Sequence, residues 1–215
     1  AMYAAFFDLD HTILSISSGR IMFRGSYDRG IIGRREVRKA FVINALYRIG
    51  LMSAGTAVGR WMKWYRGLDV DGVAPLVAEW AEELIKYVRE AARKEIAFHR
   101  DKGGMTVILS ASPDFICDRM KEHLRMDDVI CTELEVADGR LTGSLKGEYC
   151  YGPEKLARVR RYCGERGLRM EEAYYYADSI ADLPVLEAVG HPVCVTPSRA
   201  LERRARRRGW RVARW

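Results

Sequence analysis

The sequence predicts an α/β fold, in which a doubly wound, mainly parallel sheet carries an inserted all-helical block and one small hairpin. Three observations support this prediction. Short apolar runs, typical of buried strands, alternate with amphipathic helical stretches. A long segment without strands follows the first run, and an Asp-Gly pair lies between alternating apolar residues. Alternating strands and helices favour a parallel sheet covered on both faces.

Five apolar runs predict the strands of the sheet, at residues 3–7, 105–109, 129–132, 173–177 and 192–195. Amphipathic stretches predict helices between most of them, near residues 113–124, 153–166, 182–189 and 198–208. A Rossmann-like sheet of this kind binds its ligands at the carboxyl ends of the strands.

Residues 15–98 carry no convincing strand and are predicted to be helical throughout. Trp61, Trp64, Tyr65 and Leu68 share one helical face, which we interpret as a small core of this block. A turn at 67–75 should precede a long helix that runs towards His99. We therefore predict a core made of residues 1–14 and 99–215, with residues 15–98 as a helical cap.

Besides the helical block, a predicted hairpin at residues 133–145 also interrupts the alternation of strands and helices. Asp138-Gly139 stands between alternating apolar residues, which is a strong signal for a two-residue hairpin turn. The sequence contains no internal repeat and no linker long enough to separate independent domains.

The net charge of +7 is concentrated at one end of the chain. Residues 199–215 contain eight arginines and a single acid, Glu202, so this segment carries the whole excess. Such a segment could attract nucleic acid or an anionic membrane. Because Leu201, Ala205, Trp210 and other apolar residues interrupt it, we favour a solvated surface helix followed by a short strand, and nucleic acid is not the expected partner.

Other classes of protein are not favoured. No apolar run approaches the ~18–20 residues that span a bilayer, so membrane insertion is not expected. No secretion signal is recognisable, and a cytoplasmic location is the default expectation. The five cysteines form no C-x-x-C pair, which favours reduced, buried thiols over disulfides or a zinc site.

The strongest functional signal is the pair Asp8 and Asp10 at the end of the first predicted strand. Two acids at a strand tip can divide one reaction, one as nucleophile or metal ligand and the other as proton donor. The alternative is an acid pair that serves only solubility. The apolar run 4–7 directly before the pair favours a functional role.

Two further strands end in polar groups. Ser110-Ala111-Ser112 follows the second strand, where a hydroxyl and free backbone amides at a helix start could bind an anion, or a serine could simply cap the helix. Asp178 follows a later strand, with Asp182 four residues on. Clustered carboxylates suit Mg²⁺, and Lys155 at a predicted helix start could contact a phosphoryl group.

Four motifs in this order resemble the haloacid dehalogenase (HAD) superfamily, in its phosphoserine-phosphatase-like branch (subfamily IB) with a helical cap. They are Asp-x-Asp-x-Thr at 8–12, Leu-Ser-Ala-Ser at 109–112, Tyr-Gly-Pro-Glu-Lys at 151–155 and the segment 177–192. Together they extend over nearly the whole chain.

The resemblance implies a role for each matching residue. Asp8 would be the nucleophile and Asp10 the acid and base, while Mg²⁺ would be held by Asp8, the Asp10 carbonyl and Asp178. The remaining positions would bind phosphate or support the site: Ser110, Ala111 and Lys155 as phosphate-binding residues, Thr12 and Asp182 as supporting residues.

The departures from the family pattern concern the substrate. Phosphoserine phosphatases typically carry a glutamate nine positions after the nucleophile, where this chain has Ser17 followed by Ser18. Phosphoserine is therefore not favoured as the substrate. Arginines of the predicted cap, among them Arg20 and Arg24, could meet an acidic substrate instead.

The function predicted from the sequence is Mg²⁺-dependent hydrolysis of a small organic phosphomonoester through an aspartyl-phosphate. Two other functions stay open. One is a phospho-accepting signalling module, which the second acid, Asp10, disfavours. The other is a binder of nucleic acid or anionic membrane through the arginine-rich segment. No motif names the natural substrate or the oligomeric state.

Overall fold

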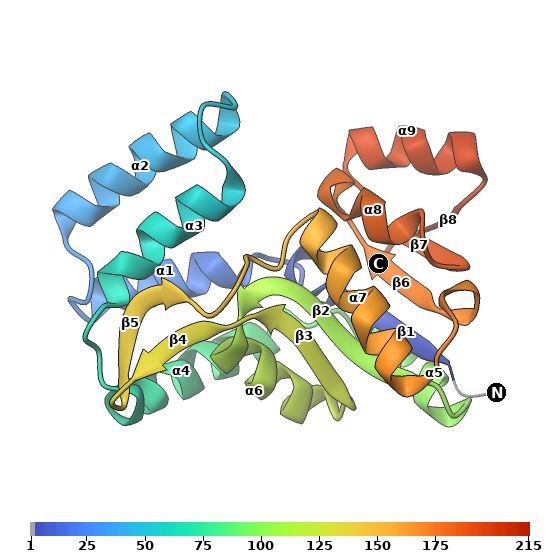
Figure 1. Cartoon of the computed structure of the whole chain (residues 1–215), viewed down its shortest axis with the longest axis horizontal. Helices are drawn as coiled ribbons and strands as arrows, with labels where there is room; N and C mark the ends of the chain where they lie inside the picture. The colour runs from blue at the N-terminus through green and yellow to red at the C-terminus, as the bar shows by residue number, and fades with distance from the viewer. Residues whose placement is uncertain (1–2) are drawn as a thin grey trace.

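The computed structural model describes residues 3–215, so residues 1 and 2 of the predicted core lie outside the described part. Its centre is a six-stranded sheet with the order β3-β2-β1-β6-β7-β8, in which all neighbouring strands are parallel (Figure 1). The strands are β1 Ala4–Phe7, β2 Met105–Pro113, β3 Asp128–Thr132, β6 Tyr174–Ala177, β7 His191–Val195 and β8 Arg211–Ala213. The predicted fold class is confirmed.

Side chains of β1 alternate between the two faces of the sheet, and both faces are buried. Ala5 and Phe7 belong to one core region, which includes apolar residues of α5 (Glu90–Asp101) and α6 (Asp114–Leu124). Ala4 and Phe6 belong to the other, which includes residues of α7 (Pro153–Arg166), α8 (Leu183–Leu186) and α9 (Arg199–Arg208). The end of β1 therefore lies inside the molecule, between two layers of helices.

The segment between β1 and β2 is helical, as the sequence predicts. It contains α1 Ser18–Asp28, α2 Arg34–Arg48, α3 Ala54–Met62, the short turn η2 Lys63–Tyr65, and α4 Val70–Ile85, followed by α5. Helix α5 packs on the sheet, with Ile96 in the same core region as Phe7. The predicted limit at residue 98 falls inside this helix, and we use "cap" below for α1 to α4.

The aromatic stripe of the cap differs from its predicted form. Helix α3 ends at Met62, so Trp64 and Tyr65 lie in η2 and Leu68 lies beyond it. These residues do not form a separate small core, because they pack into the same apolar region as Phe7 of the sheet. The cap and the sheet share one continuous interior.

The chain crosses between core and cap at two adjacent points. Leu14 and Val88 form an antiparallel bridge. On either side, the Ser15 amide donates to the Tyr87 carbonyl at 2.9 Å, and the Arg89 amide donates to the Ile13 carbonyl at 2.9 Å. The two connections are thus paired through their backbones.

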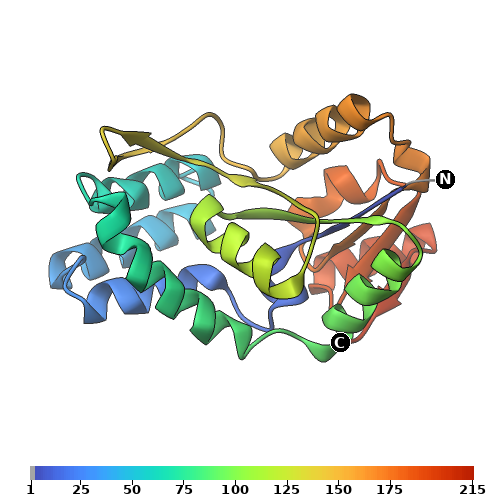
Figure 2. The same cartoon turned by 90° about the horizontal axis from the view of Figure 1, so that it is seen from below.

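The predicted hairpin is present as β4 Leu134–Ala137 and β5 Arg140–Leu145. Its turn residues Asp138 and Gly139 both have positive φ, which the preferred two-residue hairpin turn requires. The hairpin reaches from the core along the helices of the cap (Figure 2). Its backbone exchanges hydrogen bonds with the cap between Leu141 and residues Gly67 and Leu68, at 2.7 and 2.9 Å, and from the Val70 amide to the Gly139 carbonyl at 2.9 Å.

The arginine-rich segment forms α9 and the edge strand β8, as predicted. Many of its charges are paired within the molecule. Arg204 and Arg208 contact Glu187, Arg206 and Arg214 contact Glu202, and Arg211 contacts Glu95.

Three other predictions can be compared with the structure. The five cysteines are buried free thiols. Among the described residues, no helix is long and apolar enough to cross a membrane. Of the helix predicted at 182–189, α8 covers Leu183–Leu186, and a turn of 3-10 helix at Ile180–Asp182 precedes it.

Candidate active site

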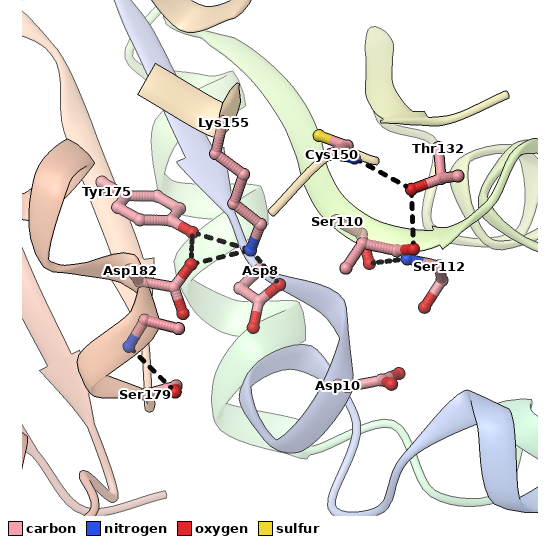
Figure 3. A network of polar contacts seen from close by, with 12 residues as sticks. Asp8, Asp10, Ser110, Ser112, Thr132, Cys150, Lys155, Tyr175, Ser179 and Asp182 are labelled. Carbon is pink, nitrogen blue, oxygen red and sulfur yellow. Dashed lines mark hydrogen bonds and ion pairs between the residues drawn. The ribbon is translucent and has the colours of Figure 1, made fainter. Parts of the chain in front are cut away.

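Asp8 and Asp10 lie at the carboxyl end of β1, but they face different surroundings. After Asp8 the chain enters the tight turn η1 Leu9–Ile13, in which Asp10 keeps an extended backbone and His11 has a φ of 57°. The Ile13 and Leu14 amides close this turn on the Asp8 and Leu9 carbonyls. Asp8 is thereby buried at the strand tip, while Asp10 is carried towards the cap (Figure 3).

Lys155 joins Asp8 to the neighbouring acid Asp182. Its Nζ donates to Asp8 Oδ1 at 2.9 Å and to Asp182 Oδ1 at 2.7 Å, and all three residues are buried. Gly152, with a φ of 56°, turns the chain into α7, and Pro153 occupies the first helical turn. This local geometry directs Lys155 from the start of α7 towards the end of β1 (Figure 3).

Tyr175 completes this buried network and was not predicted from the sequence. Its hydroxyl donates to Asp182 Oδ1 at 2.7 Å and lies 3.2 Å from Lys155 Nζ. A tyrosine within an apolar strand is not by itself a sign of a functional residue. Tyr175 and Ala177 are two residues apart and therefore lie on the same face of the sheet, which is the face that α7 covers. This shared face indicates the contact with Lys155 only once the fold is known.

The burial of these charges governs their protonation. Burial raises the pKa of the Asp8 carboxyl well above its ordinary value, although the Lys155 ammonium opposes the shift. Burial lowers the pKa of Lys155, but the Asp182 and Asp8 carboxylates outweigh it and leave that pKa well above its ordinary value. Burial and the charge of Asp182 raise the pKa of Asp178 to about 6.

The three carboxylates suit a divalent cation. Oxygen atoms of Asp8, Asp178 and Asp182 lie within 4.8 Å of one another. Within residues 3–215, the Lys155 ammonium is the one cation that pairs with this cluster, through Asp8 and Asp182. Hard carboxylate oxygens are the ligands that Mg²⁺ prefers. The residues present therefore fit the metal that the sequence predicts.

Ser110 is buried beside this cluster in an irregular part of β2. The register of β2 against β3 shifts between Leu109 and Pro113, and the Ser112 amide donates to Ser110 Oγ at 3.1 Å. Helix α6 begins at Asp114, with Pro113 at its N-cap. The alternative that Ser110 or Ser112 caps this helix is wrong, because the bulge places both serines before the cap position.

The loop around Ala111 is tied to the segment before α7. Thr132 Oγ1 donates to the Ala111 carbonyl at 2.8 Å and accepts from the Cys150 amide at 3.2 Å. Figure 3 shows these groups beside Ser110, on the side of Asp8 away from Asp182. Thr132 thus links the bulge to the segment before α7.

Asp10 is held by the first residues of the cap. Ser17 Oγ donates to Asp10 Oδ2 at 3.0 Å, and the Ser18 amide donates to Asp10 Oδ1 at 2.8 Å. The Ser18 hydroxyl in turn lies 2.7 Å from the Ser112 hydroxyl of the bulge. Both serines that the sequence marked as cap candidates therefore lie at the site, next to the second acid.

Arg20 and Arg24 lie elsewhere. They line a groove between α1 and α4 that also contains Asp28, Arg29 and Glu79. Arg24 pairs with Asp28 at 3.8 Å, and both side chains are largely exposed. The structure does not bring these two arginines to the cavity next to Asp10.

A partly open cavity of about 170 Å³ extends from Asp10 into the cap. Its core side is formed by the bulge, Thr132, Leu134 and Tyr149. Its cap side is formed by residues of α1, α3 and η2, namely Ser17, Ser18, Gly19, Met22, Phe23, Val58, Trp61, Met62, Trp64 and Tyr65. None of the apolar members was singled out as a site residue from the sequence, because an aromatic stripe at helical spacing is more typical of a core.

The fold and the site define a hydrolase with a strand-end aspartate and an inserted cap, and comparison with known proteins identifies the family. The family model for haloacid dehalogenase-like hydrolases matches residues 5–187. The chain therefore belongs to this family. A protein of Mycobacterium tuberculosis named "Probable phosphatase" is 34% identical, over 99% of this chain and 75% of its own length.

Solved structures confirm the fold. A Bordetella pertussis protein of unknown function superimposes with a TM-score of 0.92 at 26% identity, covering 99% of this chain and 98% of its own. A substrate-bound phosphoserine phosphatase superimposes with a TM-score of 0.74 at 16% identity, covering 99% and 93%. The protein is a hydrolase of the haloacid dehalogenase-like family and resembles phosphoserine phosphatase in fold.

Proposed function

We propose that the protein is a Mg²⁺-dependent phosphomonoesterase that works through an aspartyl-phosphate on Asp8. One observation carries the proposal. Asp8 is a buried carboxylate held by an ammonium at 2.9 Å, while the second acid, Asp10, is held separately by two donors from the cap. Two carboxyl groups in such different surroundings are suited to different roles in one reaction.

The metal would be held by the carboxylates of Asp8 and Asp178 and by the backbone carbonyl of Asp10. Asp182 is the less suitable ligand, because its Oδ1 already accepts from both Lys155 and Tyr175. When bound, Mg²⁺ would neutralise part of the charge that the Asp8 carboxylate and a phosphoryl group bring together.

Asp8 and Asp10 would carry out both steps of the reaction, the formation of the aspartyl-phosphate and its hydrolysis. An Asp8 carboxylate oxygen attacks phosphorus, the bond from phosphorus to the alcohol oxygen breaks, and Asp10 gives its proton to the departing alkoxide. Asp10 then takes a proton from the water that attacks phosphorus, and the bond to Asp8 breaks to release inorganic phosphate. Lys155 and Ser110 would contact the phosphoryl oxygens in both steps.

The proposal is tested by Asp8→Asn, assayed as phosphate release from p-nitrophenyl phosphate with Mg²⁺. We expect the variant to lose at least about 10³-fold in kcat, since no nucleophile replaces the carboxylate. Asp28→Asn, an exposed change in the cap, should keep full activity. Chelation of the metal should stop the wild type. Turnover that survives both Asp8→Asn and chelation would contradict the mechanism.

The two alternative functions predict different results. A signalling module would keep its phosphate, so one equivalent of phosphate transferred without further turnover would support it. Binding through the arginine-rich segment would give affinity for DNA, RNA or anionic vesicles that falls steeply with salt. The internal ion pairs of α9 and β8 do not favour such binding.

A further inference from the structure

The cavity next to Asp10 offers very little charge to a ligand. Among the described residues that line it, Asp10 is the single carboxylate, and lysine, arginine, histidine and glutamate are all missing from the lining. The walls are instead aromatic, aliphatic or thioether side chains, with a few hydroxyls between them. A leaving group with a carboxylate would lose its hydration here without gaining a cationic partner.

Most hydroxyl groups of the lining already have partners within the protein, whereas the Trp61 Nε1 donor is buried without one among the described residues. The hydroxyl of Ser17 donates to Asp10, and that of Ser18 pairs with Ser112. Thr132 bonds to the loop at Ala111, and the Tyr65 hydroxyl lies 2.8 Å from Ser26. A ligand could accept one hydrogen bond from the Trp61 indole, whereas bonds to these hydroxyls would compete with existing ones.

The size of the cavity is also informative. At about 170 Å³ it is close to the roughly 150 Å³ of an engineered apolar cavity that binds benzene. The cavity suits one aromatic ring, or an alkyl group of similar volume, attached to the phosphate oxygen that Asp10 would protonate.

We infer that the substrates are phosphomonoesters of uncharged, apolar alcohols that carry a ring-sized group, and that the aromatic cavity of the cap selects them. This inference rests on the proposed function. The cavity lies between α1, α3 and η2 on one side and the bulge of β2 on the other. An amino acid phosphate such as phosphoserine has both an ammonium and a carboxylate, and the cavity provides no cationic residue for the second of these.

The test compares three esters of unactivated primary alcohols: benzyl phosphate, phosphoserine and phosphoethanolamine. Since all three leaving groups need protonation, differences in kcat/KM report chiefly how the cavity binds the leaving group. Burying a ring-sized apolar group should favour benzyl phosphate by about 10- to 100-fold. Equal or higher kcat/KM for phosphoserine would overturn the inference while the phosphatase activity itself stood.

Matched valine variants test whether the cavity causes the preference. Val58 lines the cavity, whereas Val42 on α2 is 59% exposed. Val58→Asp should reduce kcat/KM for benzyl phosphate by at least about 10-fold and shift selectivity towards the ammonium of phosphoethanolamine. Val58→Thr, which keeps the side-chain shape, should reduce it several-fold. Val42→Asp and Val42→Thr should change neither kcat/KM for benzyl phosphate nor the selectivity between the esters. An unchanged preference in folded Val58→Thr and Val58→Asp would also overturn the inference.

A binding measurement separates this inference from the proposed function. Trp61 and Trp64 line the cavity, so tryptophan emission can report its occupation. Benzylphosphonate should bind at least about 10-fold more tightly than 2-aminoethylphosphonate. If no ester is hydrolysed, the proposed function fails, and this comparison still decides the chemistry of the cavity. Equal affinities would contradict the inference.

Discussion

At the scale of single residues, Ser17 and Ser53 each stand directly before a helix of the cap, but their side chains form different hydrogen bonds. Ser53, before α3, accepts a hydrogen bond from the Thr56 amide and so caps its helix. Ser17, before α1, makes no such cap bond and donates to Asp10 instead. One serine therefore supports a helix, and the other supports the second acid of the site.

This difference predicts opposite effects of the same substitution. Ser17→Ala should lower kcat by roughly 10-fold, the equivalent of one hydrogen bond to a charged group, with little change in stability. Ser53→Ala should leave kcat unchanged and lower the free energy of unfolding by about 1 kcal/mol. Steady-state kinetics and urea denaturation of both variants distinguish the two. A larger stability loss for Ser17→Ala than for Ser53→Ala would contradict the assignment.

His99 is a buried histidine held in its neutral form. The Tyr176 hydroxyl donates its proton to Glu95 Oε2 at 2.8 Å, so it accepts from His99 Nε2, also at 2.8 Å. Nδ1 is then the acceptor for the Tyr3 hydroxyl at 2.8 Å. A proton on Nδ1 would remove this acceptor. Burial is the main cause that lowers the pKa of His99 from 6.5 to about 4.

The lowered pKa of His99 makes stability depend on pH. Glu95 opposes the shift, while Arg211 and His191 add to it. Between pH 6.5 and about 4 the unfolded chain binds a proton at this residue that the folded protein does not, so stability falls as the pH is lowered. The loss should be on the order of 2 kcal/mol. Asp8 and Asp178, whose pKa values are raised, contribute with the opposite sign in this range. The loss due to His99 is therefore the difference between the wild type and His99→Phe in urea denaturation from pH 7 to 4.5. An equal slope in the variant would contradict the assignment.

At the scale of elements, α1 and α4 are in contact where α1 has a glycine. A Cβ on Gly25 would overlap Nε1 of Trp80, so the ring could not keep its place. Gly59, inside α3, has open space around the corresponding position. Both glycines lie in helix interiors, so they form a matched pair.

The two glycines should respond to alanine with opposite signs. Gly25→Ala should lower the free energy of unfolding by about 1–3 kcal/mol, because the two helices must separate or Trp80 must move. Gly59→Ala should raise it by about 0.5–1 kcal/mol, because alanine restricts the unfolded chain and favours the helix. Denaturant midpoints of the two variants measure the effect. A stabilised Gly25→Ala would show that the contact is not tight.

The elements also show what the sequence can predict. Apolar runs identify the main strands, and Asp138-Gly139 identifies the hairpin, because each signal is local. The bulge at residues 110–112 and the packing of α5 on the sheet depend on neighbours that are distant in sequence. The meeting of Asp8, Asp178 and Ser110 is also predictable, because the carboxyl ends of parallel strands lie at the same edge of the sheet. Tyr175 and the cavity lining require knowledge of which faces meet.

At the scale of the whole molecule, the hairpin joins the cap to the core through the backbone. Val70 is the first residue of α4, and its amide donates to the Gly139 carbonyl at 2.9 Å. A first helical residue needs no intrahelical partner for its amide, so proline is tolerated there. Asp69 before it has φ −69° and ψ 130°, which also suits a following proline. The hydrogen bond to the hairpin can therefore be removed selectively.

Val70→Pro should lower the free energy of unfolding by about 1 kcal/mol more than Val70→Ala, since only the first variant loses the hydrogen bond. In the wild type, tryptophan emission and far-ultraviolet circular dichroism should follow one unfolding transition. Trp61, Trp64 and Trp80 report on the cap in this comparison. Equal stability of the two variants would show that the hairpin does not hold the cap.

The same hairpin bears on how this protein could be recombined with its relatives. The cap is inserted at Leu14 and Val88, which invites exchange of the segment between them as a module. Residues 134–145, however, lie outside that segment and hydrogen-bond to it through Gly67, Leu68 and Val70. A chimera built from the insertion alone would separate the partners of these bonds. A transplantable unit must include the hairpin, so two stretches of chain have to be exchanged together.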